Sequence, residues 1–156
     1  MRRLLTFLLL LPLAGCSALD AVKSLVGLGG PEKTALESVQ VVAQAEANRD
    51  LPTRLDLVFV FDTALAAQLP KTGPAWFQQK AALLAANPGK LRALSLEIPP
   101  QTETSPALPK GYAKAVTVLA YADYLAAAGQ PVINLTPFER PRITLRPEAI
   151  DVAAGP

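Results

Sequence analysis

The sequence contains no histidine and only one cysteine, Cys16. The lack of histidine excludes catalytic triads built on that residue, acid–base catalysis by imidazole, and the commonest set of transition-metal ligands. A single cysteine also excludes a disulfide within the chain. Any catalysis would therefore depend on carboxylates, lysines and hydroxyl groups.

Neither sign of charge predominates after the first few residues. Of the 15 basic residues, Arg2 and Arg3 lie at the N-terminus, which leaves 13 basic residues against 13 acidic ones. Proteins that bind nucleic acid or a membrane surface through charge carry a basic patch or run. The composition therefore indicates neither a nucleic-acid partner nor an electrostatically held membrane surface.

The N-terminus has the layout of an export signal. Arg2 and Arg3 are basic, residues 4–13 are almost entirely apolar, and small residues precede Cys16. A secretory signal peptide has a basic segment, about 7–15 apolar residues and a small-residue cleavage site. The apolar run is too short to span a bilayer, which needs about 20 apolar residues. We therefore expect residues 1–15 to be a signal peptide that is removed.

The four residues Leu13-Ala14-Gly15-Cys16 resemble the lipobox of bacterial lipoproteins. The resemblance implies that the Cys16 thiol is diacylated, that the chain is cut just before it, and that the new amino terminus is acylated. Several acyl chains anchor a protein far more firmly than one chain does. By the same resemblance, Ser17 in place of an aspartate favours the outer membrane. The alternative is an ordinary cleaved signal with an unrelated cysteine nearby.

A lipidated tether over residues 16–34 is expected to precede a domain over residues 35–156. The apolar residues of the tether have the spacing of a short helix, which is interrupted by Gly27, Gly29, Gly30 and Pro31. A glycine-rich segment of this kind is flexible. The alternative is a short helix docked on the domain.

Alternating apolar residues predict several short strands. From Ser38 to Ala45, every second residue is apolar, as in a half-buried strand, and residues 48–52 have the composition of a turn. Later strands are expected over residues 91–98, 113–122, 132–135 and 142–145, with residues 150–152 finishing the last one. Short strands separated by turns and one helical insert are typical of a β-sandwich.

The segment 55–62 is apolar on both of its faces. One face carries Leu55, Leu57, Phe59 and Phe61, and the other carries Val58 and Val60 between Asp56 and Asp62. A strand with two apolar faces is covered on both sides. We therefore expect a helix over the two valines.

Two helices are expected directly after this strand. A short helix over residues 63–69 would be capped by Asp62 or Thr63, and a longer one would begin at Pro74 and end near Asn87. The apolar stripe of the longer helix is predicted to comprise Trp76 or Phe77, Ala81, Leu83 and Leu84. We interpret Trp76 and Phe77 as packing anchors rather than a platform for a ligand.

Two later segments are predicted to lie outside regular structure. Residues 99–110 contain four prolines among polar residues and are expected to form a long exposed loop, either a recognition element or a plain spacer. Residues 134–141 form either a contact surface or a hairpin connection with Phe138 in the core.

The sequence offers few candidate catalytic residues. Asp56 and Asp62 point the same way on one strand but lie about 20 Å apart, beyond the 5–9.5 Å or so that paired-carboxylate hydrolysis requires. We interpret both as solvated charges. The sequence has no GxSxG motif, no phosphate-binding glycine loop and no calcium-binding loop. We therefore predict a protein that is not an enzyme, with no metal and no cofactor besides the lipid on Cys16.

The order of these features resembles the small outer-membrane lipoproteins of bacterial type VI secretion systems. The likeness is carried by the lipobox, the strand from Ser38, the turn with Pro52, the strand over residues 55–62, the run Trp76-Phe77-Gln78-Gln79-Lys80 and the closing run 134–145. The resemblance implies a mainly β protein, a transthyretin-like β-sandwich with a helical insertion after the second strand.

In that family the lipoprotein ties the membrane-spanning core of the secretion machine to the outer membrane. A loop between its first two strands contacts the periplasmic domain of an inner-membrane subunit. Carried over by position, that loop is residues 47–54, with Asn48, Arg49, Asp50 and Pro52 as exposed partner-binding candidates. This loop is short and the helical insert is long, so the resemblance does not distinguish a core lipoprotein of the secretion system from an accessory one.

The predicted function is therefore that of an outer-membrane-anchored lipoprotein that tethers a partner subunit of a secretion machine in the periplasm. Two alternatives remain. One is a lipoprotein that acts on peptidoglycan or binds glycans, and the other is a periplasmic inhibitor or immunity-type binder.

Overall fold

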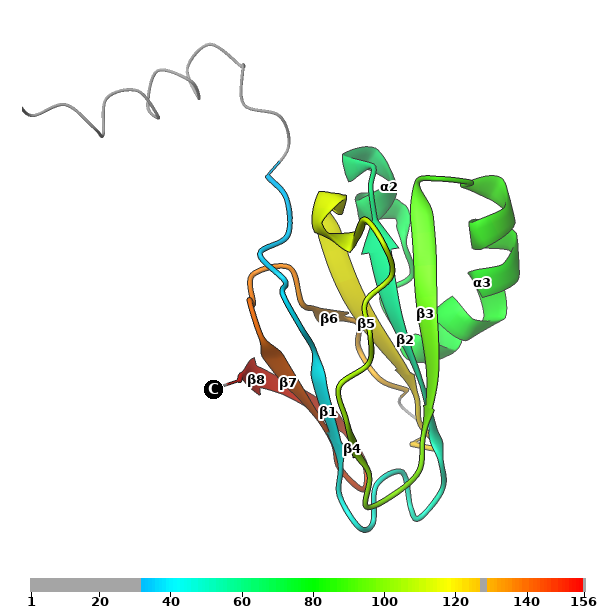
Figure 1. Ribbon diagram of the computed structural model, residues 1–156. Coiled ribbons are helices and arrows are strands. Elements are labelled where there is room, and N and C mark those ends of the chain that lie inside the picture. The colour runs from blue at the N-terminus through cyan, green and yellow to red at the C-terminus, as the bar shows by residue number, and fades with distance from the viewer. Residues whose placement is uncertain (1–31, 127–128, 156) are drawn as a thin grey trace, which may run out of the picture. The chain divides into compact units, whose positions relative to one another are not determined.

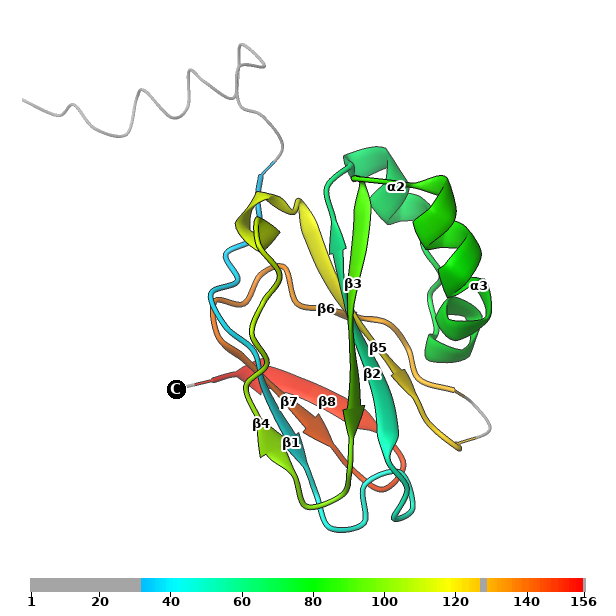
Figure 2. The same cartoon turned by 45° about the vertical axis from the view of Figure 1, so that its right-hand side comes forward.

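The computed structural model describes residues 32–126 and 129–155 (Figure 1). The predicted signal peptide, the lipidation of Cys16 and most of the tether lie outside these residues. The described chain forms two four-stranded sheets, with the strand orders β4-β1-β7-β8 and β3-β2-β5-β6. Helices cover the outer face of the second sheet (Figure 2). The prediction of a mainly β sandwich with a helical insertion after the second strand is confirmed.

Three strands of the first sheet, β1, β4 and β8, differ from the prediction. It is formed by β1 (Gln40–Ala43), β4 (Glu103–Thr104), β7 (Pro141–Leu145) and β8 (Ile150–Ala154). The prediction that the first strand continues to Ala45 was wrong, because the chain turns after Ala43 and leaves Ala45 exposed. Residues 150–152 do not finish the preceding strand; they belong to β8, which pairs antiparallel with β7.

The second sheet is built around β2 (Thr53–Val60), with β3 (Leu91–Ile98) and β5 (Thr117–Asp123) on either side. The short β6 (Ile133–Asn134) adds to the edge of β5. All pairings in this sheet are antiparallel. The strand predicted over residues 91–98 is thus confirmed. The strand predicted over residues 113–122 is confirmed from Thr117 onward, whereas its start was wrong, because residues 112–114 form a 3₁₀ helix.

The space between the two sheets holds the larger core. Its buried side chains come from both sheets and include Val39, Val41, Leu55, Leu57, Phe59, Val118, Leu135, Ile143 and Leu145. Burial of aliphatic and aromatic side chains on this scale is the main source of folding free energy. The inward face of β2 is the face that the alternating pattern predicted.

A second core lies between β2 and two helices, α2 (Thr63–Gln68) and α3 (Gly73–Ala86). Val58 and Val60 are fully buried there, so the helix expected over them is confirmed. Asp62 caps α2, because its Oδ1 accepts a hydrogen bond of 3.0 Å from the Leu65 N–H. The prediction of the apolar stripe of α3 was partly wrong, since Ala81 is exposed.

Residues 99–110 are not a free loop. Glu103 and Thr104 pair with β1, so the segment crosses from one sheet to the other. Leu108 packs against the core between the sheets. The prediction failed because a two-residue strand and one apolar residue among prolines leave no periodic pattern. A single-turn 3₁₀ helix, η1 (Tyr112–Lys114), follows.

The two ends of the sandwich differ. At one end, which we call the tether end, the Thr34 N–H donates to the Ala115 carbonyl at 2.8 Å. At the other, which we call the loop end, lie the turns 44–52, 99–102 and 146–149 and the segment after β5 (Figure 1). Among the described residues, no helix is long and apolar enough to cross a bilayer.

Candidate partner-binding surface

The turn between β1 and β2 has a strained backbone. Asn48, Arg49 and Asp50 have φ values of 48°, 58° and 63°, so three successive residues other than glycine are left-handed. This conformation costs about 1–2 kcal/mol for most residues and less for Asn and Asp, so the strain falls mainly on Arg49. Strain of this kind persists only where the surroundings enforce it, and it clusters at binding sites.

Asn48 enforces this conformation from inside the protein. It is 4% exposed, and its Oδ1 accepts a hydrogen bond of 2.9 Å from the Leu125 N–H. Its Nδ2 donates to the carbonyls of Pro52 at 3.5 Å and Asp123 at 3.4 Å. The expectation that Asn48 is exposed was wrong, because its short amide fits between the turn and the end of β5. Asn48 therefore positions the turn and does not present its side chain to solvent.

The other three predicted contact residues do lie on the surface. Arg49, Asp50 and Pro52 are exposed, and Arg49 forms an ion pair of 2.8 Å with Glu148 in the turn between β7 and β8. The side-chain hydrogen bond between the two raises the pKa of Arg49 and lowers the pKa of Glu148. Since both side chains are more than half exposed, solvent screens the pair, and it mainly fixes the direction of Arg49.

Two exposed leucines flank the same turn. Leu51 is 45% exposed and Leu125 is 56% exposed, and among the described residues they are the exposed large hydrophobic side chains. Both leucines are hydrogen-bonded to Asn48 through their backbone. The Leu51 N–H donates to the Asn48 carbonyl at 3.3 Å, and the Leu125 N–H donates to Asn48 Oδ1 at 2.9 Å. Single exposed leucines are common. Two of them hydrogen-bonded to one buried residue give the loop end an exposed apolar pair, which a partner could cover.

Leu125 was not identified from the sequence. It follows β5, in an alanine-rich stretch just after the strand that was predicted to end at Ala122. One available signal was a large apolar residue within that alanine run, where no core position was expected. Its hydrogen bond to Asn48 joins residues 77 positions apart, which a local pattern does not reveal.

A second cluster lies beneath α3. Asp56 is 1% exposed, and its carboxylate accepts hydrogen bonds from Trp76 Nε1 at 2.8 Å and Lys80 Nζ at 3.1 Å. The interpretation of Asp56 as a solvated charge was wrong, because the helix covers the outer face of β2 at this position. Trp76 also stacks on Tyr121, with ring centroids 4.8 Å apart, which confirms its role as a packing anchor.

The same cluster does not have the arrangement of a catalytic site. Lys80 donates to Ser95 Oγ at 2.7 Å while it pairs with Asp56 at 2.8 Å. An ammonium group in this position cannot take the proton of the serine. The adjoining hollow of about 330 Å³ includes Phe77, but Arg54 lies 4.9 Å over the Phe77 ring and covers it. Asp62 has a structural role as a helix cap and pairs with Lys90.

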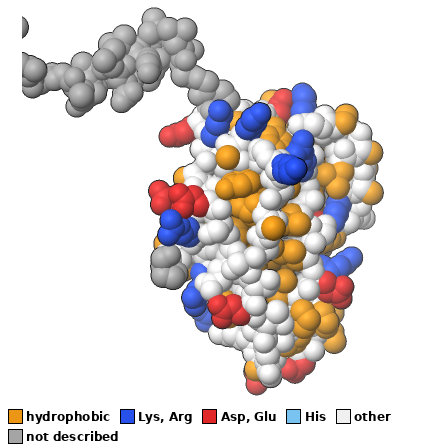
Figure 3. Space-filling view, in the orientation of Figure 1, with side chains coloured by type: hydrophobic (Ala, Val, Ile, Leu, Met, Phe, Trp, Pro, Cys, Tyr) orange, Lys and Arg blue, Asp and Glu red, His pale blue; other side chains and the backbone are white. Residues whose placement is uncertain are grey.

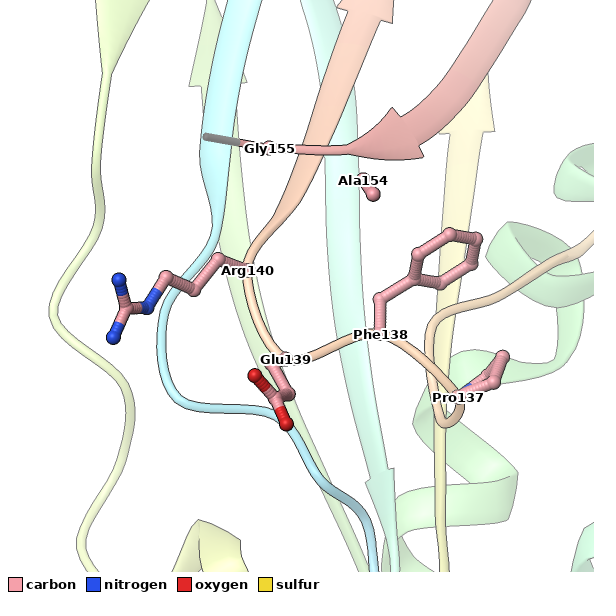
Figure 4. A pocket seen from close by; sticks show the side chains of 6 residues that line it. All are labelled: Pro137, Phe138, Glu139, Arg140, Ala154 and Gly155. Carbon is pink, nitrogen blue, oxygen red and sulfur yellow. The ribbon is translucent and has the colours of Figure 1, made fainter.

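Another hollow lies beside β8 (Figure 4). It measures about 430 Å³ and is lined by Pro137, Phe138, Glu139, Arg140, Ala154 and Gly155. Phe138 is half-buried and points toward Ala154, outside both cores. Residues 134–141 connect the two sheets, so the hairpin with Phe138 in the core was wrong. Within residues 32–126 and 129–155, no group of three metal-binding side chains is found.

No family model and no curated protein matches the sequence. Solved structures do share its fold. The type VI secretion lipoprotein TssJ1 from Pseudomonas aeruginosa is 15% identical, with a TM-score of 0.53 over 81% of this chain and 98% of that chain. Lip from Serratia marcescens, a membrane-bound component of the type VI secretion system, is 10% identical, with a TM-score of 0.53 over 76% and 96%.

A chain from the structure of the type VI secretion protein TssM C-terminal domain from EAEC is also similar. It is 14% identical, with a TM-score of 0.54 over 80% of this chain and 100% of that chain. At these identities the likeness is one of fold. The chain therefore has the β-sandwich fold of type VI secretion lipoproteins, as the sequence resemblance predicted.

Proposed function

We propose that this protein, which has the fold of type VI secretion lipoproteins, is anchored in the outer membrane by lipid on Cys16 and holds a partner subunit of a secretion machine in the periplasm. In this proposal the protein is a tether and not an enzyme. The partner is the periplasmic domain of an inner-membrane subunit. The lipobox-like run and the shared fold support the anchor and the system, and the loop end supports the contact.

One observation carries the proposed contact. The turn after β1 holds three left-handed residues, and two exposed leucines, Leu51 in this turn and Leu125 after β5, are hydrogen-bonded to its residue Asn48. In the unbound protein, neither the backbone strain nor the exposed leucines contribute to stability. A partner that covers both leucines would gain the burial of their exposed halves, about 0.7–1.7 kcal/mol for each leucine.

The residues have distinct roles in this proposal. Leu51 and Leu125 form the apolar centre of the contact, and Arg49, Asp50 and Pro52 lie at its border. Asn48 acts through the others by fixing the turn. Because the Arg49 side chain is paired with Glu148, its guanidinium is already oriented before a partner arrives.

The test is a pulldown from detergent-solubilised cell envelope with the lipidated protein. We expect a large inner-membrane subunit of a type VI secretion machine to be captured and identified by mass spectrometry. The variant Leu51→Ser/Leu125→Ser should lose that subunit, because it removes the apolar centre. Gln78→Ala/Gln79→Ala, two exposed changes on α3, is the matched control and should retain it.

Other results would contradict the proposed function. If both variants retain the subunit, the loop end is not the contact. If the protein captures peptidoglycan fragments or one soluble effector instead of an envelope subunit, a glycan-binding or inhibitory role replaces the tether. The anchor is tested separately, since Cys16→Ser should leave a folded domain that no longer fractionates with membranes.

A further inference from the structure

A basic hollow lies at the tether end of the sandwich. It measures about 610 Å³, and its lining is Phe61, Gly89, Arg92, Lys110, Gly111 and Lys114. Three of these six residues are cationic and none is acidic. Lysine and arginine side chains gather at this end of the molecule (Figure 3).

The positive charge of the basic hollow is fixed and not neutralised. Arg92 is held by a hydrogen bond of 3.0 Å from Nη1 to the Lys110 carbonyl and lies 5.5 Å over the Phe61 ring. Within the described chain, Lys110 and Lys114 form no ion pair. The carboxylate of Asp62, next to Phe61, is already paired with Lys90 at 2.9 Å.

The basic hollow adjoins the point where the chain leads toward Cys16. Lys114 is followed by Ala115, whose carbonyl accepts the hydrogen bond from Thr34. Residues 16–33 number 18 and reach at most about 60 Å when fully extended. A membrane that holds acyl chains on Cys16 is therefore within reach of this end of the domain.

We propose that the basic hollow docks on the anionic headgroups of the phospholipid surface in which Cys16 is anchored. Headgroup phosphates would accept hydrogen bonds from Arg92, Lys110 and Lys114, since arginine and lysine are the residues that bind phosphate best. The proposal rests on the proposed lipid anchor. It would orient the domain with the loop end directed away from the membrane, toward a partner.

The sequence composition did not predict this surface, and the structure shows why. Arg92 lies on β3, whereas Lys110 and Lys114 come from the segment around η1. The basic residues therefore form no run, and the near-zero net charge hides their gathering at one end. Near an anionic leaflet, each basic residue strengthens binding about fivefold.

The test uses the full lipidated protein added to vesicles of phosphatidylcholine, with or without phosphatidylglycerol. Lysine reactivity is measured by acetylation and mass spectrometry after flotation. We expect Lys110 and Lys114 to react about fivefold more slowly on the anionic vesicles. Lys71, an exposed lysine between α2 and α3, is the internal control and should react equally on both. High salt should abolish the difference.

Two single variants sharpen the test. Lys110→Gln should weaken the protection of Lys114, whereas Lys71→Gln should not. Equal reactivity of Lys114 on neutral and anionic vesicles would overturn the docking and leave the anchor intact. Equal protection on neutral vesicles with inorganic phosphate would also overturn it, because the hollow would then bind a free anion. Failure to float with either vesicle would overturn both the docking and the anchor.

Discussion

Asp56 connects the helical layer to the second sheet through its buried carboxylate. Asp56→Ala would leave the Trp76 N–H and the Lys80 ammonium group without their acceptor, and we expect it to lower the free energy of unfolding by about 3 kcal/mol. Asp56→Asn keeps an acceptor for the indole and should cost about half as much. Urea denaturation measures both variants.

The control for this prediction is Glu139→Ala, which removes an exposed carboxylate. It should change the free energy of unfolding by less than about 0.5 kcal/mol, as is usual for surface positions. A similar loss for Asp56→Ala and Glu139→Ala would show that the buried cluster contributes nothing specific.

Asn48 is the residue on which the shape of the candidate contact depends. Asn48→Ala removes three side-chain hydrogen bonds at a position with φ of 48°, and we expect a loss of about 2–4 kcal/mol. Asn48→Gly restores the backbone freedom but not the bonds, so it should cost less. Thermal denaturation measures the stability, and the envelope pulldown should show weaker capture for both. An Asn48→Ala protein with unchanged stability would contradict the anchoring role.

At the scale of elements, the start of α3 lies unusually close to β5. A Cβ atom on Gly73 would lie 2.0 Å from the Ala122 carbonyl oxygen, so no side chain fits without a backbone shift. We expect Gly73→Ala to lower the free energy of unfolding by at least about 3 kcal/mol. Gly89→Ala is the matched control. Its φ is 77° but its Cβ would meet nothing within 4 Å, so about 1–2 kcal/mol is expected.

The helical layer also shows what local patterns can predict. The apolar outer face of β2 predicted the cover over Val58 and Val60, because uncovered valines would face water. The same pattern placed Asp56 on that face without indicating which residue of α3 would meet it. Trp76 and Lys80 follow it by 20 and 24 positions, so their hydrogen bonds depend on how α3 packs. Periodicity predicts on which face of a strand a side chain lies, whereas its hydrogen-bond partners depend on how the neighbouring elements pack.

At the scale of the whole molecule, the parts that the sequence did not predict join distant segments. β4 is two residues long and depends on pairing with β1, and Leu51 and Leu125 are connected only by their hydrogen bonds to Asn48. The basic hollow is likewise assembled from separate elements. The order of elements was predictable because each long strand and helix has its own pattern. The surfaces were not, because they form only once the sheets are packed.

Tyr124 links the two sheets at the loop end, and this link should make stability depend on alkaline pH. Its hydroxyl lies 3.0 Å from the Arg146 carbonyl and 2.9 Å from the Ala149 carbonyl, both next to the turn between β7 and β8. Burial raises the pKa of Tyr124 to about 12, from the usual 10. Between these values the unfolded chain has released a proton that the folded protein retains. Stability should therefore fall as the pH rises from 10 to 12, by up to about 2–3 kcal/mol from this residue.

Tyr124→Phe isolates this contribution, because lysine deprotonation affects both proteins equally. The variant should be less stable at pH 8, where it lacks the hydroxyl bond, but its free energy of unfolding should fall less steeply between pH 10 and pH 12. Tyr121→Phe should act in the same direction, since burial also raises the pKa of Tyr121, whose hydroxyl donates to the Pro70 carbonyl at 2.8 Å. Denaturation at several alkaline pH values measures the slopes. If the slope for Tyr124→Phe equals that of the unmodified protein, the contact between the sheets does not control alkaline unfolding.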